Sequence, residues 1–359
     1  MADGSRARAL PPISRPAIIP PVVVQPGVEK LDSPVLLPDD SEFPIPTFAI
    51  AKLDRRKRKM PQCIAHRGYK ARFPENTLLA FEKALEAGAV ALETDVHITK
   101  DDVVVLSHDA TLKRCFGPKD KVIDRTWDEI KDLRTLAPPH EHMPRLRDLL
   151  DYLSQPGLED IWVLLDIKLD NDAESIMRLI GKTIAEADLG TGKPWSERVV
   201  LGIWAAKYLP LAAKYLPRFP VMHIGFKLSY ARHFFDVPDV GFNMLLPMLM
   251  APGGAKFIRD CQEVYHRQLL AWTVNDKDRM AWCIRRQLDG VITDDPSMFV
   301  EACETHDEYS KEPAIPVGFR GCVEILRVYI LISALFWLFR RRLNPTAKPA
   351  LIEKAPRQD

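Results

Sequence analysis

The sequence predicts an α/β protein built on a (β/α)8 TIM barrel with an antiparallel hairpin after its second strand. Short β-rich segments alternate with helix-length amphipathic segments over residues 61–305, and a stretch of about 240 residues is the size of such a barrel. The chain has 359 residues, of which 47% are hydrophobic, so it can bury a large core. Its 50 basic and 49 acidic residues leave a formal charge of +1, which excludes a general nucleic-acid binder, since such a protein needs a basic excess.

Prolines interrupt residues 1–60, with ten between positions 11 and 46, so no helix or strand period develops there. We therefore predict a disordered arm. Three arginines near its start are similar to those of a transit peptide, but the prolines oppose the amphipathic helix that such a presequence needs. The arm ends in five successive cations at 55–59, which are typical of a nuclear-localisation patch, a solvated linker or a contact with anionic lipid.

Nine segments of the predicted barrel have the composition of buried strands. They are 63–67, 91–96, 103–108, 162–168, 199–203, 221–225, 242–246, 270–274 and 291–294. A closed barrel of this type needs eight strands. The third segment resolves the difference, because only about seven residues separate it from the second, too few for a crossover between parallel strands.

The second and third segments are therefore predicted to form an antiparallel hairpin with a two-residue turn at positions 101 and 102. In this register Asp95 lies opposite His108. Glu93 lies on the same face as Asp95, because alternate residues of a strand point to the same side. Eight parallel strands remain for the barrel.

The residues after 305 divide into a charged, amphipathic linker over 306–327, a hydrophobic membrane anchor over 328–342 and a disordered tail over 343–359. The twelve uncharged residues of the anchor would reach only about 18 Å as a helix, against a hydrocarbon core of about 30 Å. Extending the helix backwards adds Arg320, Glu324 and Arg327, which form one polar stripe. We expect the segment to span a membrane or to lie embedded in it. The alternative is a final amphipathic helix that covers the barrel.

Charged side chains gather at the predicted carboxyl ends of the first strands, where barrels of this type carry their active sites. They are His66, Arg67, Glu93, Asp95, His108, Asp166 and Lys168. The three carboxylates favour a hard divalent cation, Mg²⁺ or Ca²⁺, over zinc, which prefers nitrogen and sulfur ligands. The two histidines fit a general acid and a general base, while the two cationic side chains fit a phosphoryl group that gathers negative charge.

Other residues give a weaker signal. A single histidine at a strand end is more often structural, and we predict that role or a surface position for His140, His142 and His223. Trp272, in the seventh predicted barrel strand, fits core packing or a wall for the substrate, and it joins the candidate substrate-binding residues. The six cysteines include no C-x-x-C pair, so neither a zinc module nor a dense disulfide framework is predicted.

The segment IAHRGYKARFPENTLLAFEKALEAGAVALETDVHITKDDVVVLSHDATL, residues 64–112, resembles the N-terminal signature of the glycerophosphodiester phosphodiesterase family, with its HRG, PENT, E-x-D and HD elements in order. The resemblance continues through LLDIK at 164–168, AWTVND at 271–276 and GVITDDP at 290–296, so it covers the whole predicted barrel. Together with a C-terminal hydrophobic segment, the chain is most similar to the membrane-anchored members that act as phospholipase C on phosphatidylglycerol.

The resemblance implies roles for individual residues. It implies that His66 and His108 are catalytic and that Arg67 and Lys168 contact the phosphate. It further implies that Glu75 orients Arg67 without contacting the substrate itself. The implied metal ligands are Glu93, Asp95 and Asp166, of which the last is one methylene shorter than the glutamate of many relatives.

We expect from this resemblance a phosphodiesterase that converts phosphatidylglycerol to diacylglycerol and glycerol 3-phosphate, with a phospholipid as its partner and no nucleic acid or obligate protein partner. Three alternatives stay open: hydrolysis of soluble deacylated diesters, lysophospholipase D activity, and a catalytically dead scaffold tethered to a membrane. The hydrophobic segment leads us to expect an intracellular membrane location with the barrel in the cytosol. Endoplasmic reticulum, mitochondrion and lipid droplet are all compatible.

Overall fold

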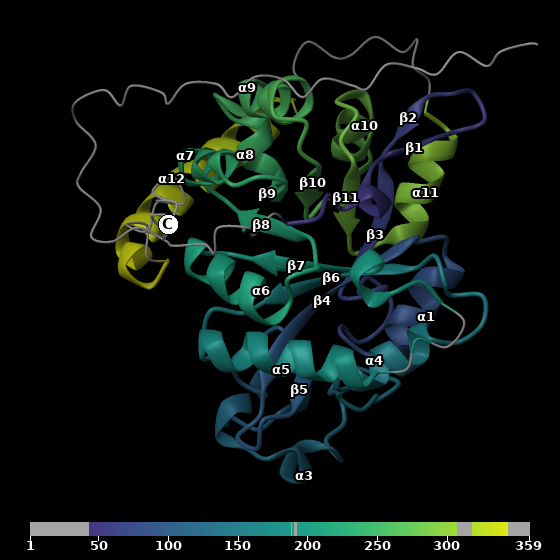
Figure 1. The fold of residues 1–359 in the computed structure, drawn as a ribbon. Coiled ribbons are helices and arrows are strands. Elements are labelled where there is room, and N and C mark those ends of the chain that lie inside the picture. Colours follow the sequence, from purple (N-terminus) through teal and green to yellow (C-terminus); the bar gives the residue numbers. More distant parts are fainter. Residues whose placement is uncertain (1–42, 188, 190–191, 307–317, 344–359) are drawn as a thin grey trace, which may run out of the picture.

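The computed structural model describes residues 43–187, 189, 192–306 and 318–343, and a closed barrel of parallel strands lies at its centre (Figure 1). Within the described residues, each barrel strand pairs with the next along the chain, and β11 pairs with β3, which closes the ring. The barrel strands are β3 Gln62–His66, β4 Ala91–Ile98, β6 Trp162–Ile167, β7 Val199–Ile203, β8 Val221–Gly225, β9 Gly241–Leu245, β10 Leu269–Trp272 and β11 Gly290–Thr293. The predicted (β/α)8 barrel is confirmed.

Helices surround the barrel and cover its outer face (Figure 1). In α4, Leu146, Leu149, Leu150 and Leu153 are buried, which is the spacing of a single helix face. The α-helices of the barrel are α1 Leu78–Glu86, α4 Leu146–Leu153, α5 Ala173–Glu186, α6 Leu209–Tyr215, α7 Leu228–Ala231, α8 Leu246–Met250, α9 Gly254–Arg259, α10 Lys277–Arg285 and α11 Pro296–Glu304. Shorter turns are η3 Trp195–Glu197, η4 Ala206–Tyr208, η5 Arg232–Asp236 and the π-helical η6 Asp260–Val264.

Successive side chains of each strand point alternately into the barrel interior and towards the helical layer. In β4, Ala91 belongs to the apolar cluster inside the barrel, whereas Leu92 and Val96 belong to the core beneath the helices. Glu93 and Asp95 share the parity of Ala91, so they face the interior nearer the carboxyl end. An apolar layer therefore fills the amino end of the barrel and charged groups occupy the carboxyl end.

The predicted hairpin forms, but its predicted register is wrong by one residue. Strand β5, Val104–Leu106, pairs antiparallel with β4, with Val96 opposite Leu106. The amide of Ser107 donates to the carbonyl of Asp95, so Asp95 lies opposite Ser107 and not opposite His108. The reason is the turn: the amide of Thr99 donates to the carbonyl of Val103, which leaves three residues in the loop, and the last of them, Asp102, has a φ of 66°.

A short excursion with its own apolar core follows β5. It contains α2 Lys113–Phe116, η2 Val122–Asp124 and α3 Trp127–Ile130, and it lies at the bottom of Figure 1. Val105, Leu112, Phe116, Val122, Ile130 and Met143 are buried together there. This separate core fixes the excursion against the barrel, and with it the loop that carries His108.

The prediction of a disordered arm up to residue 60 is wrong for residues 43–60, while residues 1–42 lie outside the described part of the chain. The turn η1 Thr47–Ala49 places Phe48 edge-on against Trp162, with ring centroids 5.7 Å apart, where it closes the amino end of the barrel. The side chain of Gln62 donates to the carbonyls of Phe48 and Ile50. The basic run at 55–59 belongs to a two-stranded ribbon of β1 Lys52–Leu53 and β2 Lys59–Met60, in which Arg58 pairs with Asp54.

Helix α12, Gly318–Leu343, confirms a helix in the predicted anchor but begins inside the predicted linker. It packs against α8, and Ile332 is buried. Among the described residues, no helix has both the length and the apolarity that crossing a bilayer requires. The predicted membrane anchor stays a prediction.

Candidate active site

One cavity of about 140 Å³ opens at the carboxyl ends of the barrel strands. It brings together seven of the predicted residues, His66, Arg67, Glu93, His108, Asp166, Lys168 and Trp272. Asp95 lies fully buried beside them, and Glu75 contacts Arg67 from the side away from the cavity lining. Four further residues of the lining were not predicted: Trp204, Ile224, Asn243 and Ile292.

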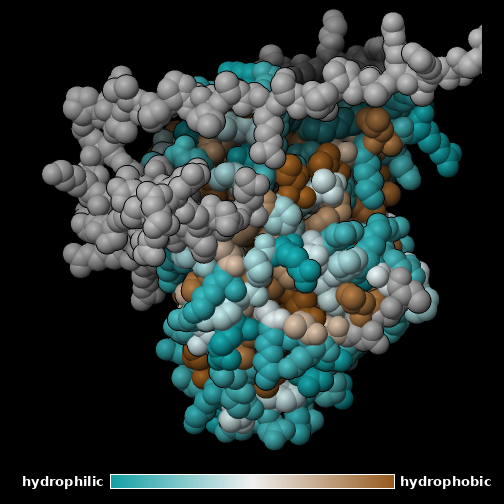
Figure 2. Space-filling view, viewed as in Figure 1, coloured by the Kyte–Doolittle hydropathy of each residue, from teal (hydrophilic) through white to brown (hydrophobic). Residues whose placement is uncertain are grey.

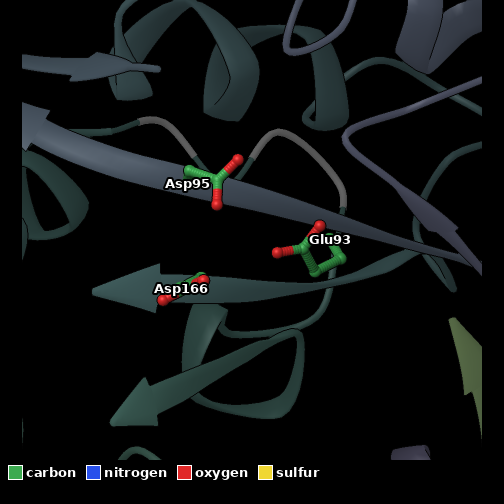
Figure 3. Close-up of side chains that lie close together, drawn as sticks. All are labelled: Glu93, Asp95 and Asp166. Atoms are coloured by element: carbon green, nitrogen blue, oxygen red, sulfur yellow. The ribbon is translucent and has the colours of Figure 1, made fainter. Parts of the chain in front are cut away.

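Three buried carboxylates meet in this cavity (Figure 3). Glu93 and Asp95 project from the same face of β4, and Asp166 lies opposite Asp95 on β6. One oxygen from each of the three lies within 4.8 Å of the others. Burial, and then the charges of Asp95 and Asp166, raise the pKa of Glu93 well above its ordinary value. A divalent cation would relieve this repulsion, and three carboxylate oxygens are ligands that Mg²⁺ and Ca²⁺ accept, so the donor set fits the predicted metal.

Two cationic side chains neutralise part of this charge. Lys168 Nζ lies 2.7 Å from Oδ1 of Asp95 and 2.6 Å from Oδ2 of Asp166. Arg67 Nε lies 3.1 Å from Oδ2 of Asp95. Burial would lower the pKa of Lys168, but the carboxylates of Asp166 and Asp95 outweigh it and raise that pKa. Burial would likewise raise the pKa of Asp95, but Lys168 and Arg67 hold it well below its usual range. Both cations therefore stay charged beside the cavity.

A carboxylate orients each candidate catalytic histidine. Nδ1 of His66 lies 2.6 Å from Oδ1 of Asp294, and Nδ1 of His108 lies 2.7 Å from Oδ1 of Asp109. The amide of Asn275 donates to Asp294 and holds it in place. With Nδ1 bound to a carboxylate, Nε2 of each ring is the nitrogen left for proton transfer. Burial lowers the pKa of both histidines, and the nearby carboxylates only partly offset it.

The PENT segment builds the wall between β3 and α1, and the side chains of Glu75, Asn76 and Thr77 each make a specific contact there. Glu75 accepts a hydrogen bond from Arg67 at 2.9 Å. Asn76 donates to Oδ2 of Asp95 at 2.8 Å and so fixes that carboxylate. Thr77 caps α1 by accepting from the amide of Ala80 and donates to the carbonyl of Pro74.

The HRG segment before it requires its glycine. Gly68 has a φ of 80°, and a Cβ on it would lie 2.7 Å from the backbone of Ala80, so no other residue fits between β3 and α1. Arg67 itself has a φ of 56°, an unusual backbone for a non-glycine residue, and its amide donates to Glu93. The turn therefore aims the guanidinium at the carboxylates.

Aromatic residues form the opposite side of the cavity. Trp204 follows β7 and Trp272 ends β10, and their rings meet edge to face with centroids 5.6 Å apart. Phe226, after β8, lies next to Trp204. The indole nitrogen of Trp204 donates to Oδ1 of Asp166 at 2.6 Å, so it holds the shorter acid at the third predicted metal position.

Sequence reasoning missed five residues that hold the candidate site: Asn76, Asp109, Arg114, Trp204 and Asp294. Three of them lie inside the quoted segments PENT, HD and GVITDDP, so the motifs already contained the signal. Trp204 and Arg114, of which the latter donates to Glu75 and Asp109, stand outside any acidic or histidine pattern. Only their contacts in space single them out.

The family and its relatives match the barrel region. The model of the Glycerophosphoryl diester phosphodiesterase family matches residues 66–298. A glycerophosphodiester phosphodiesterase of Bacillus altitudinis is 26% identical over 252 residues, which cover 68% of this chain and 99% of that protein. A lysophospholipase D of Rattus norvegicus is 43% identical over 76 residues, 21% of this chain and 24% of that protein.

Solved structures show the same fold. A phosphodiesterase of Oleispira antarctica in complex with the product sn-glycerol-3-phosphate has a TM-score of 0.57 and 19% identity, over 68% of this chain and 98% of that one. At this identity the likeness bears on the fold alone.

Proposed function

The chain belongs to the glycerophosphoryl diester phosphodiesterase family, whose members are phosphoric diester hydrolases, and from this we propose that it hydrolyses a glycerol-containing phospholipid with the help of a divalent cation. The preferred substrate is phosphatidylglycerol, and the products are diacylglycerol and glycerol 3-phosphate. One observation supports this proposal above the others. The cavity combines a charged side that fits a phosphodiester with an aromatic side that fits apolar groups.

Glu93, Asp95 and Asp166 would hold the cation, either Mg²⁺ or Ca²⁺. When bound, it would act as a Lewis acid on the phosphoryl oxygens. Arg67 and Lys168 lie in the same lining and would bind the remaining nonbridging charge as it develops. The three carboxylates would thus position the positive charge of the cation, and Arg67 and Lys168 would add two further positive charges.

His66 and His108 would move the protons. One Nε2 accepts the proton of the headgroup hydroxyl next to the phosphate, whose oxygen then bonds to phosphorus. The bond between phosphorus and the diacylglycerol oxygen breaks, and the second histidine protonates that oxygen. Water then attacks the phosphorus of the cyclic phosphate and gives a proton to the second histidine. The bond between phosphorus and the attacking headgroup oxygen breaks, and the first histidine returns its proton to that oxygen, which gives glycerol 3-phosphate. Asp294 and Asp109 keep the two imidazoles oriented during both steps.

The size of the cavity indicates which part of a phospholipid enters. A volume of about 140 Å³ is below the usual 300–1,000 Å³ of a site that encloses a drug-sized ligand, so the headgroup and phosphate enter while the acyl chains stay outside. A small recess adjoins the cavity, and its lining includes His223, Phe226, Lys227 and Tyr230. The glyceride end of the substrate would leave the cavity along this aromatic side.

Helix α12 lies on the same side of the mouth. It packs against α8, which directly follows β9, and its Glu324 pairs with Arg279 near the start of α10. Leu326, Ile330 and Leu331 are each more than half exposed on it. In Figure 2 the lower part of the molecule, over α3 and α5, is mostly hydrophilic, and hydrophobic residues gather higher, towards the barrel. An apolar helix beside the mouth supports a reaction at a lipid surface over one on soluble diesters.

Product analysis tests the substrate. Purified protein is incubated with phosphatidylglycerol vesicles and a divalent cation, and the products are identified by mass spectrometry. Diacylglycerol with glycerol 3-phosphate supports the proposal. Lysophosphatidic acid from a lysophospholipid would favour the second candidate, lysophospholipase D, which the similarity to the rat enzyme suggests. Hydrolysis of soluble diesters alone would contradict both.

Charged substitutions on α12 test the lipid contact. Leu326→Glu with Ile330→Glu changes two exposed side chains, so the fold should be kept while binding to anionic vesicles falls at least tenfold. Val264→Glu is the matched control, because Val264 is 55% exposed and lies on η6. Equal vesicle binding of both variants would contradict the role of α12. The expected location at endoplasmic reticulum, mitochondrion or lipid droplet stays a prediction, which cell fractionation tests.

A further inference from the structure

Arg114, in the short helix α2 of the excursion, makes four hydrogen bonds to two carboxylates of the candidate site. Its side chain is 47% exposed, and it is not part of the cavity lining. We propose that Arg114 is a positioning residue that sets the distance between the phosphate-binding side chain Arg67 and the proton-transferring His108. The proposal rests on the proposed function of these two residues.

The first pair of bonds acts on His108. Nε of Arg114 lies 2.7 Å from Oδ2 of Asp109, and a terminal nitrogen lies 3.0 Å from Oδ1. Oδ1 of Asp109 is the oxygen that binds Nδ1 of His108 at 2.7 Å. Arg114 therefore fixes both the rotation and the charge of the carboxylate that orients this imidazole. Burial alone would raise the pKa of Asp109, but the hydrogen bonds from Arg114 and His108 lower it to about 2.

The second pair of bonds acts on Arg67. The terminal nitrogens of Arg114 lie 2.8 Å and 2.7 Å from the two oxygens of Glu75. Oε1 of Glu75 also accepts from Arg67 at 2.9 Å. Glu75 is thus held between two guanidinium groups. Its carboxylate cannot move with Arg67, because Arg114 fixes it. The charges of Arg114 and Arg67 also offset the effect of burial and lower the pKa of Glu75.

Only an arginine can make this connection. The guanidinium is planar and carries five donors, so it can bind one carboxylate through Nε and one terminal nitrogen and another through both terminal nitrogens. A lysine side chain has a single nitrogen and cannot form a bidentate pair of hydrogen bonds with each of two carboxylates. The two carboxylates come from different parts of the barrel, since Glu75 precedes α1 and Asp109 follows β5. Arg114 therefore ties the excursion to the β3–α1 wall across the edge of the cavity.

The test compares Arg114→Gln and Arg114→Lys with Arg125→Gln in the full chain. Arg125 is the matched control because it lies in the same excursion, is 42% exposed and also pairs with two carboxylates, Asp120 and Glu129, which bind none of the candidate catalytic groups. For Arg114→Gln, kcat on the substrate that the wild type hydrolyses should fall about 10- to 100-fold, with KM changed less than about threefold. Arg114→Lys should recover only part of this loss. Arg125→Gln should stay within about twofold of wild type.

A second measurement does not depend on turnover. The imidazole ¹⁵N signals of His108, assigned by comparison with His108→Ala, should shift in Arg114→Gln and stay unchanged in Arg125→Gln. Wild-type kcat with unchanged ¹⁵N signals in Arg114→Gln would overturn the role of Arg114 while leaving the proposed function intact. A wild-type protein that hydrolyses no glycerophosphodiester, but whose His108 signals respond to Arg114→Gln, would overturn the function and keep the positioning role.

Discussion

The two sides of the barrel mouth differ in their side chains: one side is charged and the other is aromatic and aliphatic. On the side built by β3, β4 and β6, Arg67, Asp166 and Lys168 pair with groups of opposite charge. Each of the two histidines binds a carboxylate, and Glu93 lies 4.0 Å from His66. On the side built by β7, β8 and β10, the cavity lining includes Trp204, Ile224 and Trp272, and Phe226 lines the adjoining recess. The two sides meet at the hydrogen bond from Trp204 to Asp166.

This difference indicates that the two sides of the mouth bind different parts of the substrate. A buried charge without a partner is unfavourable by several kcal/mol, so charges are retained inside a barrel where they contact another charge or bind a ligand. An aromatic wall provides no such charge, but it offers apolar surface to a glyceride. The charged side is therefore expected to determine the rate of the chemical step, and the aromatic side to determine the affinity for lipid.

Substituting the histidines of the charged side should have the largest effect. His66→Ala and His108→Ala each remove a proton-transfer group, so kcat should fall about 10²- to 10⁴-fold with the fold intact. Steady-state hydrolysis of phosphatidylglycerol vesicles measures this loss, and circular dichroism checks the fold. His142→Ala is the control, since His142 is exposed and binds only a backbone carbonyl. Near-normal turnover in either cavity variant would contradict the assignment.

Neutralising one carboxylate should separate metal binding from stability. In Glu93→Gln the affinity for Mg²⁺ or Ca²⁺ should fall at least tenfold, because an anionic ligand is lost. The chelator-treated variant should nevertheless melt at a higher temperature than the chelator-treated wild type, because burial and like charges raise the pKa of Glu93 and make its ionised form unfavourable. Calorimetric titration and thermal melts measure the two quantities. Glu82→Gln, on the surface of α1, should change neither.

Removing the aromatic wall should have a smaller effect, of a different kind. In Trp272→Ala the KM for phosphatidylglycerol vesicles should rise about tenfold, while kcat changes less, because the ring contacts the substrate and transfers no proton. The KM for a soluble glycerophosphodiester should change little. Trp127→Ala, in α3, is the control. A loss confined to kcat would show that the wall acts in the chemical step and would remove the distinction between the two sides.

His223 gives the smallest predicted effect and contrasts with the histidines of the mouth. It is stacked on Phe234 behind the aromatic side, and burial lowers its pKa to about 3. Because the unfolded chain binds a proton near pH 6.5 and the folded chain does not, stability from this site is complete above pH 6.5 and is lost as the pH falls towards 3. Between pH 7 and pH 5 the free energy of unfolding should fall by about 2 kcal/mol more in wild type than in His223→Phe.

Urea unfolding at both pH values measures this difference. In His223→Phe, kcat at pH 7 should be close to wild type, because His223 lines the small adjoining recess and not the cavity that contains the charged groups. Parallel pH dependence of the two proteins would contradict the buried neutral state of His223.

Much of the candidate site was predictable because its residues follow local rules. Glu93 and Asp95 share a strand face through the two-residue period. His66 ends β3 and Lys168 follows β6, and the composition of both strands identifies them. The hairpin could be inferred from the short spacing between its strands. Its register could not, because one extra residue in the turn moves His108 relative to Asp95, and the sequence allows either turn.

The prediction was least successful where long-range contacts decide the structure. Residues 43–60 have the composition of a disordered arm, yet Phe48 closes the barrel because Trp162 and Gln62 offer it a ring and a hydrogen-bonding side chain. Helix α12 begins inside the predicted linker and packs against α8. In both cases the stabilising partner is far away in the sequence, so no local pattern predicts the contact.

The sequence alone determined the barrel, the order of its strands and the identity of the charged groups at their carboxyl ends, because strand period and residue chemistry are properties of short segments. Only the tertiary structure decided which carboxylate orients which histidine, that Arg114 connects Glu75 to Asp109, and that Trp204 holds Asp166. These contacts depend on distances between segments far apart along the chain, and such distances exist only once the barrel has closed.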